Sequence, residues 1–218
     1  MTIKQRKELV NIVHSRLLAK WGKLRCALDF SNPYQLLVAV MLSAQCRDER
    51  VNAVTPDFFD RWPDARALAS ADTAEVGKVI CNCVLFRTKA KHLIAAAQKI
   101  VDLHNGEVPD TMEELTGLDG VGRKSANVLL GDAFNKPGFP VDTHVKRVAR
   151  RIGIASTDDP EKTEREICIC LAEEYWSNFS HLLIALGRQI CHAGKKECDI
   201  CPLSDICAEN KKKSRKKF

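Results

Sequence analysis

The sequence lacks a long apolar segment. Its longest apolar run extends only from Leu36 to Leu42, whereas a membrane-spanning helix needs about 20 apolar residues. The first ten residues include three basic side chains, but no apolar segment follows them. We therefore expect neither a membrane span nor a secretory signal.

The sequence also lacks segments in which β-branched or other apolar residues alternate with polar ones between turn residues, as in half-buried strands. Apolar residues recur instead at helical spacing, in the groups Leu9, Ile12, Val13, Leu17, Leu18 and Leu93, Ile94, Ala97, Ile100. Asn32-Pro33 and Trp62-Pro63 have the pattern of helix starts, with proline in the first turn. The sequence therefore predicts an all-α protein, and 218 residues allow one large or two small domains.

Outside its last eight residues, the sequence has no excess of either charge. The chain has 34 Lys and Arg against 28 Asp and Glu, a formal net charge of +6. The tail, residues 211–218, holds five Lys, one Arg and no acid, so the rest of the chain is formally neutral. We expect this low-complexity tail to be mobile. The total charge does not by itself indicate that the folded part binds nucleic acid.

Disulfides are not expected among the ten cysteines, because a chain of this size without a secretory signal more often uses them as thiols and metal ligands. Four cysteines with the spacing C-x6-C-x2-C-x5-C can converge on one ion or cluster: Cys191, Cys198, Cys201 and Cys207. Only one short pair is present, and Pro202 follows the third cysteine, so the spacing favours an iron–sulfur cluster and leaves zinc open. We interpret the others as small buried hydrophobic residues: Cys26, Cys46, Cys81, Cys83, Cys168 and Cys170.

Two glycines interrupt the helical pattern at Gly120 and Gly122. They allow a tight turn, and the free N–H groups of the helix that follows favour an anion such as phosphate. A plain corner between two helices is an equally good interpretation. Arg123 adds positive charge, and Lys124 falls in the first helical turn, where an ammonium group is disfavoured. Such a lysine can act as a nucleophile, although a solvated surface lysine is the simpler interpretation.

Asp142 has the pattern of a helix N-cap. In a cleft, the same carboxylate can instead accept a proton or stabilise a developing cation. The surrounding segment, residues 118–153, holds seven basic residues and three acids. This local excess predicts a basic patch made by Arg123, Lys124, Lys136, Lys146, Arg147, Arg150 and Arg151.

These motifs together resemble the iron–sulfur branch of the helix–hairpin–helix DNA glycosylases, the endonuclease III family. The resemblance covers nearly the whole chain up to the tail and includes two further segments, 42–48 and 104–109. It implies a [4Fe–4S] cluster on the four spaced cysteines. It also implies a monomeric cytoplasmic enzyme, associated with the nucleoid in a bacterium, that acts on damaged double-stranded DNA.

The resemblance implies roles for individual residues. Lys124 corresponds to the Schiff-base nucleophile and Asp142 to its catalytic carboxylate. Gln45 corresponds to a glutamine that enters the space left by the flipped base, and Leu85 to a leucine that wedges into the base stack. Without the resemblance, Gln45 is a surface residue and Leu85 a core residue. Further DNA contacts are expected at Gly120, Gly122, Arg123, His144, Lys195 and Lys196.

The implied activity is that of a bifunctional DNA glycosylase and AP lyase, which excises oxidised pyrimidines and cuts the strand by β-elimination. Five residues depart from the family pattern: Cys46, Arg47, Val84, Thr116 and Asp119. Asp119 adds an acid near the expected phosphate path, and the changes near Gln45 and Leu85 leave the lesion spectrum open. The alternatives are another lesion specificity, such as ultraviolet dimers or mismatches, and a non-enzymatic iron–sulfur DNA-binding sensor.

The implied architecture has two helical subdomains that flank a DNA-binding cleft. Residues 25–136 are expected to form a six-helix barrel that ends with the helix–hairpin–helix motif. Residues 1–24 and 137–210 are expected to form the iron–sulfur subdomain from both termini, followed by the mobile basic tail of residues 211–218.

Overall fold

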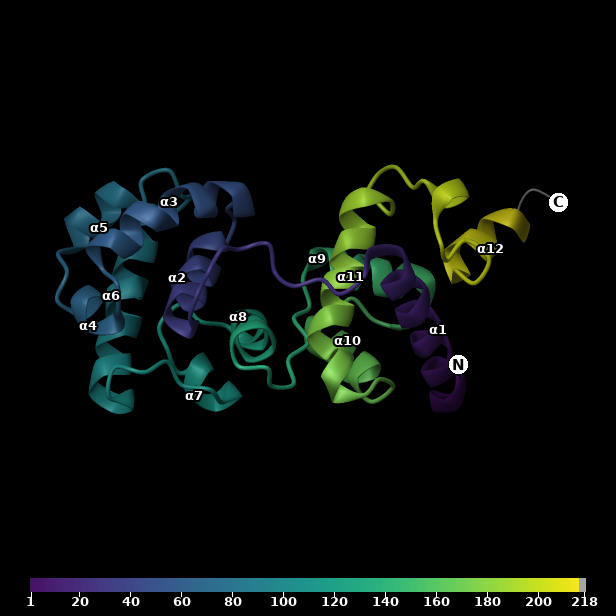
Figure 1. The fold of residues 1–218 in the computed structure, drawn as a ribbon. Helices are drawn as coiled ribbons and strands as arrows, with labels where there is room; N and C mark the ends of the chain where they lie inside the picture. Colours follow the sequence, from purple (N-terminus) through teal and green to yellow (C-terminus); the bar gives the residue numbers. More distant parts are fainter. Residues whose placement is uncertain (216–218) are drawn as a thin grey trace. The chain divides into compact units, whose positions relative to one another are not determined.

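The protein is described by a computed structural model that covers the backbone of residues 1–215 and the side chains of residues 1–211 (Figure 1). Within this part of the chain, the only β-type pairing is an isolated bridge between Cys191 and Lys196, and the predicted all-α class is confirmed. None of the described helices is long and apolar enough to cross a membrane. The chain divides into two compact units.

The first unit, Cys26–Lys136, is called the hairpin unit. Its helices are α2 (Pro33–Ser43), α3 (Asp48–Arg61), α4 (Ala65–Ala69), α5 (Thr73–Val79), α6 (Phe86–His104), α7 (Met112–Thr116), α8 (Arg123–Val128) and a π-helical turn, η1 (Leu129–Ala133). The resemblance implies six helices here, and two of the seven α-helices, α4 and α7, have only five residues. Helix α6 packs against α2, α4 and α5.

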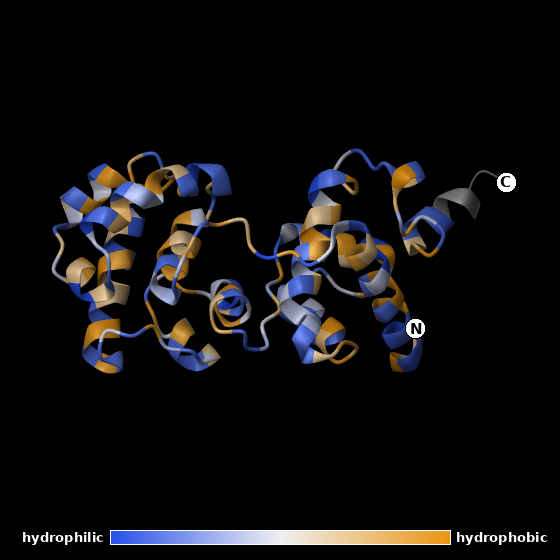
Figure 2. Cartoon of the chain, in the orientation of Figure 1, coloured by the Kyte–Doolittle hydropathy of each residue, from blue (hydrophilic) through white to orange (hydrophobic). Residues whose placement is uncertain are grey.

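Helix α2 is the buried centre of the hairpin unit. The apolar run Leu36–Leu42 is buried throughout, and α2 is mainly orange in Figure 2. A helix that is hydrophobic on all sides is stable only inside a core. As predicted, α2 begins at Pro33, and the Asn32 side chain caps it by accepting from the Gln35 N–H. The predicted start at Pro63 is wrong, because Asp64 caps α4 and the proline precedes that cap.

The second unit, Met1–Arg25 with Pro137–Phe218, is called the terminal unit. The sequence predicts unit boundaries after residues 24 and 136, and the two units of the structure are divided after residues 25 and 136. Its helices are α1 (Ile3–Trp21), α9 (Thr143–Ile152), α10 (Pro160–Cys168), η2 (Glu173–Tyr175), α11 (Trp176–Gln189), η3 (Cys198–Ile200) and α12 (Ala208–Arg215). Helix α12 covers the first five residues of the expected mobile tail, and Lys216, Lys217 and Phe218 lie outside the described residues.

Helix α11 forms the core of the terminal unit with α1 and α9. The buried face of α1 consists of Val10, Val13, His14 and Leu17. Ile12, predicted to belong to the apolar face, is 44% exposed because the face is narrower than the spacing indicated.

The interpretation of six cysteines as buried residues is only partly correct. Cys83 and Cys170 are buried, three others are partly exposed, and Cys81 is exposed. Cys81 lies in the turn after α5, where no helix covers it.

Candidate active site and metal centre

The predicted helix–hairpin–helix motif connects α7 to α8 inside the hairpin unit. The Val121 N–H donates to the Leu118 carbonyl at 3.2 Å and closes the turn. Gly120 has a φ of 78°, in the left-handed region that favours glycine. Gly122 is the N-cap of α8, so Lys124 is the second residue of the helix, and its side chain is exposed.

The two glycines of the hairpin serve different purposes. A Cβ atom at Gly120 would lie 3.0 Å from the His92 ring on α6, so glycine lets the hairpin approach that helix. A Cβ atom at Gly122 would meet no atom within 4 Å. Gly122 therefore leaves open space beside the N–H groups that begin α8, where a phosphate can approach the backbone.

The acid at Asp119 is neutralised within the hairpin unit. Lys99 Nζ on α6 lies 2.9 Å from Asp119 Oδ2 and also donates to the Gly117 carbonyl at 2.9 Å. This hydrogen bond from Lys99 lowers the pKa of the Asp119 carboxyl below its usual range. Asp119, which departs from the family pattern, therefore has Lys99 as its partner, and this ion pair links the hairpin to α6.

Gln45 and Leu85 both project from short loops in the left-handed conformation. Gln45 follows α2 and has a φ of 56°, and Leu85 precedes α6 and has a φ of 60°. Leu85 is 56% exposed, and its neighbour Val84 is also exposed. Leu85 is therefore not a core residue. Strained, exposed residues of this kind are found at functional sites.

Lys89 is a residue of this region that the sequence prediction missed. Its side chain is only 7% exposed, and its Nζ donates to the Leu42 and Ala44 carbonyls at 2.6 Å and 2.7 Å. The sequence spacing could have indicated that Lys89 is buried. Lys89 lies one helical turn before Leu93 and two before Ala97, on the buried face of α6.

Asp142 caps α9 in the terminal unit, as predicted. Its Oδ1 accepts from the Val145 N–H at 2.8 Å, and the side chain is partly exposed. The cap uses only one of the two carboxylate oxygens. His144 follows on α9, with its Nδ1 3.2 Å from Arg147 Nη2, and it packs where α9 meets Gly187 of α11.

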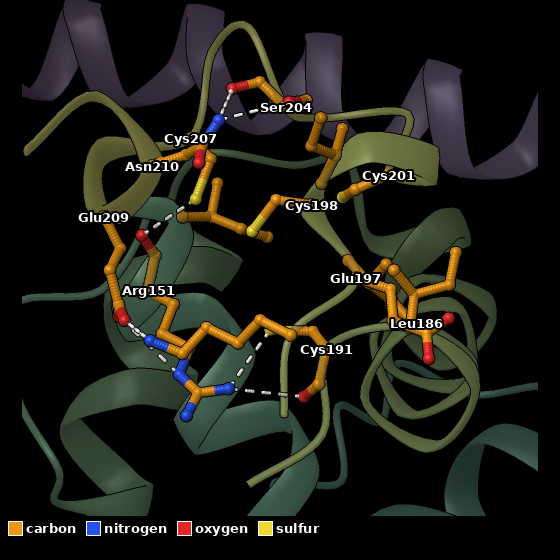
Figure 3. A pocket seen from close by; sticks show the side chains of 14 residues that line it. Arg151, Leu186, Cys191, Glu197, Cys198, Cys201, Ser204, Cys207, Glu209 and Asn210 are labelled. Carbon is orange, nitrogen blue, oxygen red and sulfur yellow. Dashed lines mark hydrogen bonds and ion pairs between the residues drawn. The ribbon is translucent and has the colours of Figure 1, made fainter. Parts of the chain in front are cut away.

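The four spaced cysteines line one pocket in the terminal unit (Figure 3). The remaining wall includes the apolar side chains Ile152, Leu186, Ile190 and Leu203. Burial raises the pKa of the Cys201 and Cys207 thiols. Among the described residues, no three Cys, His, Asp or Glu side chains meet at a point suited to a single metal ion.

Arg151 supports this cysteine cavity from α9. Its guanidinium donates to Cys191 Sγ at 3.3 Å and lies 3.6 Å from a Glu209 oxygen (Figure 3). It also donates to the His192 carbonyl at 2.6 Å. The Cys207 thiol donates to the Arg151 carbonyl at 3.3 Å. One residue therefore links α9 to both ends of the cysteine segment.

The other predicted DNA-binding cations differ in how much of their charge is accessible. Lys195 pairs with Glu197 at 3.4 Å but keeps an 81% exposed side chain, whereas Lys196 is 18% exposed and forms an ion pair with Glu209. Most cations of the basic patch predicted in residues 118–153 also bind groups of the protein itself. Lys136 pairs with Asp110, Arg150 with Asp158, and Arg147 binds the carbonyls of Gly187 and Cys191.

Comparison with known proteins gives a consistent match. Residues 38–170 match the family described as HhH-GPD superfamily base excision DNA repair protein. The endonuclease III of Synechocystis sp. is 49% identical over 183 residues, which cover 84% of this chain and 84% of its own.

Two solved structures are similar along the whole length of the chain, each with 36% sequence identity. A non-covalent endonuclease III–DNA complex has a TM-score of 0.89 and covers 99% of both chains. A trapped endonuclease III–DNA covalent intermediate, an estranged-adenine complex, has a TM-score of 0.90 and covers 99% of this chain and 100% of its own.

The two hairpin glycines should respond differently to alanine. Gly120→Ala should lower the free energy of unfolding by about 1–3 kcal/mol, because it forces a Cβ atom into the left-handed region and against His92. Gly122→Ala should change it by less than about 0.5 kcal/mol, because its φ of −94° suits alanine and the space is open. Urea unfolding of both variants measures the difference. Equal losses would contradict the assigned geometry.

Proposed function

The chain belongs to the HhH-GPD superfamily of base excision DNA repair proteins, and we propose that Lys124 and Asp142 carry its chemistry. It is a DNA glycosylase and AP lyase of the endonuclease III type. The proposed substrate is duplex DNA that contains an oxidised pyrimidine. We further propose that it acts as a monomer in the cytoplasm, on the nucleoid if the cell is bacterial, since ten cysteines suit a reducing compartment.

One observation carries the assignment of the nucleophile. The similar endonuclease III forms a trapped covalent intermediate with DNA, and a Schiff base with the sugar, the intermediate proposed for this chain, requires an amine. Lys124 is the exposed amine that directly follows the glycine hairpin, in the first turn of α8. This position supports Lys124 as the residue that forms the Schiff base.

Binding would begin with contacts that carry no sequence information. The N–H groups at the start of α8 would hold a backbone phosphate in the open space at Gly122. The damaged nucleotide would then leave the stack, at a cost of a few kcal/mol that is lowest for a damaged base. Gln45 would fill the vacated space, and the exposed Leu85 would wedge into the stack. Arg123, His144, Lys195 and Lys196 are proposed as further contacts.

The chemistry would proceed through the sugar. Neutral Lys124 attacks C1′ as the bond from C1′ to the base breaks and the base departs. The Asp142 carboxylate stabilises the cationic sugar and assists transfer of the lysine proton. The lysine proton then passes to O4′ as the C1′–O4′ bond breaks, which opens the sugar ring and leaves the Schiff base. The Schiff base acidifies the C2′ hydrogen. Loss of this proton to solvent forms the double bond and expels the 3′ phosphate by β-elimination, which cuts the strand 3′ to the lesion.

The terminal unit is proposed to be an iron–sulfur subdomain, with a [4Fe–4S] cluster held by Cys191, Cys198, Cys201 and Cys207. Four cysteines around one partly apolar pocket support this proposal, because four Cys thiolates are the ligand set of a [4Fe–4S] cluster. The cluster would cross-link a segment that has few apolar residues of its own. This would also fix the loop that carries Lys195.

The two alternative functions are not favoured by these comparisons. A non-enzymatic sensor would not explain similarity to a protein that bonds covalently to DNA. Another lesion specificity would keep the same reaction on the same scaffold. An excision assay with duplexes that each carry one damaged base, among them an oxidised pyrimidine, an ultraviolet dimer and a mismatch, tests the proposed substrate.

Replacing the proposed nucleophile should abolish the covalent intermediate. Borohydride should link the protein to duplex DNA with an oxidised pyrimidine, and Lys124→Ala should remove this product, because no other amine holds its position. Lys4→Ala changes an exposed lysine of α1 and is the matched control. Trapping that survives in Lys124→Ala would show that another residue is the nucleophile.

Asp142→Asn separates catalysis from folding. Asparagine caps a helix about as well as aspartate, so the melting temperature should stay within about 2 °C of the wild type. Loss of the negative charge should slow base release about 100-fold or more in a single-turnover assay. An unchanged rate would leave Asp142 with the cap as its only role.

The cluster is tested by Cys201→Ser. The purified wild-type protein should contain about four iron and four acid-labile sulfide ions per chain, and the variant should lose most of both. Cys168→Ser, in α10 of the same unit, is the control and should keep them. Zinc without sulfide in the wild-type protein would contradict the proposed cluster.

A further inference from the structure

The loops of Gln45 and Leu85 each hold a residue in an unfavourable conformation. Their φ values of 56° and 60° lie in the left-handed region, although both residues have a Cβ atom. Such a conformation persists only where the surrounding structure enforces it. The contacts that enforce it therefore matter for whatever these two side chains do.

Lys89 contacts both loops, one through its backbone N–H and the other through its buried ammonium group. Lys89 lies one turn into α6, and its backbone N–H donates to the Leu85 carbonyl at 3.0 Å. Its Nζ donates to the Leu42 carbonyl at 2.6 Å and to the Ala44 carbonyl at 2.7 Å. Ala44 immediately precedes Gln45, so Lys89 fixes the peptide that begins the strained turn.

The surroundings of Lys89 make the burial of its ammonium group unfavourable in free energy. Burial lowers the pKa of Lys89, and the neighbouring groups that act on it electrostatically are the thiols of Cys83 and Cys46. Burial also raises the pKa of Cys83 to about 11, so this thiol is neutral near pH 7 and does not offset the charge. An apolar side chain of similar length would avoid the desolvation cost of the ammonium.

We propose that Lys89 is a positioning residue, which orients the Ala44 peptide and so holds Gln45 ready to enter the DNA beside Leu85. Lys89 is not a catalytic residue, because its own contacts are within the protein. This inference rests on the proposed function of Gln45 and Leu85, and its test is designed so that the two can fail separately.

Lys89→Met keeps the length and apolar stem of the side chain but removes both hydrogen bonds. Single-turnover excision from duplex DNA should slow about tenfold. Borohydride trapping on a single-stranded abasic oligonucleotide should not change, because no base stack has to be opened. Lys91→Met, at an exposed position on the same helix, is the matched control. An equal loss on both substrates would indicate general damage to the fold and overturn the inference.

A double variant tests whether Lys89 acts through Gln45. If it does, Gln45→Ala with Lys89→Met should be about as slow as Gln45→Ala alone, since the positioned side chain is already gone. Losses that multiply would show independent effects and overturn the inference. Lys89→Arg keeps a positively charged donor group at the end of a long side chain and should recover most of the duplex rate.

Two further outcomes show whether the role of Lys89 or the role of Gln45 is wrong. If Gln45→Ala leaves duplex excision unchanged, the proposed role of Gln45 is wrong. If Gln45→Ala slows excision but Lys89→Met does not, only the inference on Lys89 is wrong. Should Lys89→Met fail to fold, Lys89→Gln, which keeps one donor, carries the same comparison of duplex and single-stranded substrates.

Discussion

The hairpin unit depends on how the largely buried helix α2 can end. Helix α2 packs against α3, α6, α8 and η1, and Leu42 in its last turn is buried. A buried carbonyl without a donor costs about 1–3 kcal/mol. Many helices solve this problem with a glycine in the left-handed conformation, but this chain has Ala44 and Gln45. Lys89 supplies the donors instead, and the two carbonyls in turn make its buried charge tolerable.

Helix α6 extends this arrangement to the other loops of the unit. Its N-cap is Leu85, and it reaches the Gln45 loop through Lys89. Farther along, His92 lies against Gly120, and Lys99 pairs with Asp119. Three loops that are far apart in sequence are therefore held by one rigid element. Their relative positions within the hairpin unit follow from the geometry of a single helix, which explains how short loops can be placed accurately.

Local chemistry made part of this structure predictable. The capping residues Asn32 and Asp142 and the hairpin glycines act on neighbours within a few residues, so the sequence was enough to find them. The exposure of Leu85 depends on where the surrounding helices end, and the partner of Asp119 lies twenty residues away on another helix. Such features depend on tertiary contacts, which spacing in the sequence does not encode. The resemblance to a family supplied Gln45 and Leu85 for that reason.

The excess of basic residues in the sequence does not correspond to an accessible basic surface. The segment 118–153 has an excess of basic residues, yet Arg147 and Arg151 donate to carbonyl groups around the cysteine segment, and Arg150 and Lys136 pair with carboxylates. These cations stabilise the protein itself and are less available to release counterions from DNA. Backbone N–H groups at a turn need no such excess. A hairpin that presents them beside an open glycine can therefore position a phosphate even though residues 1–210 are formally neutral.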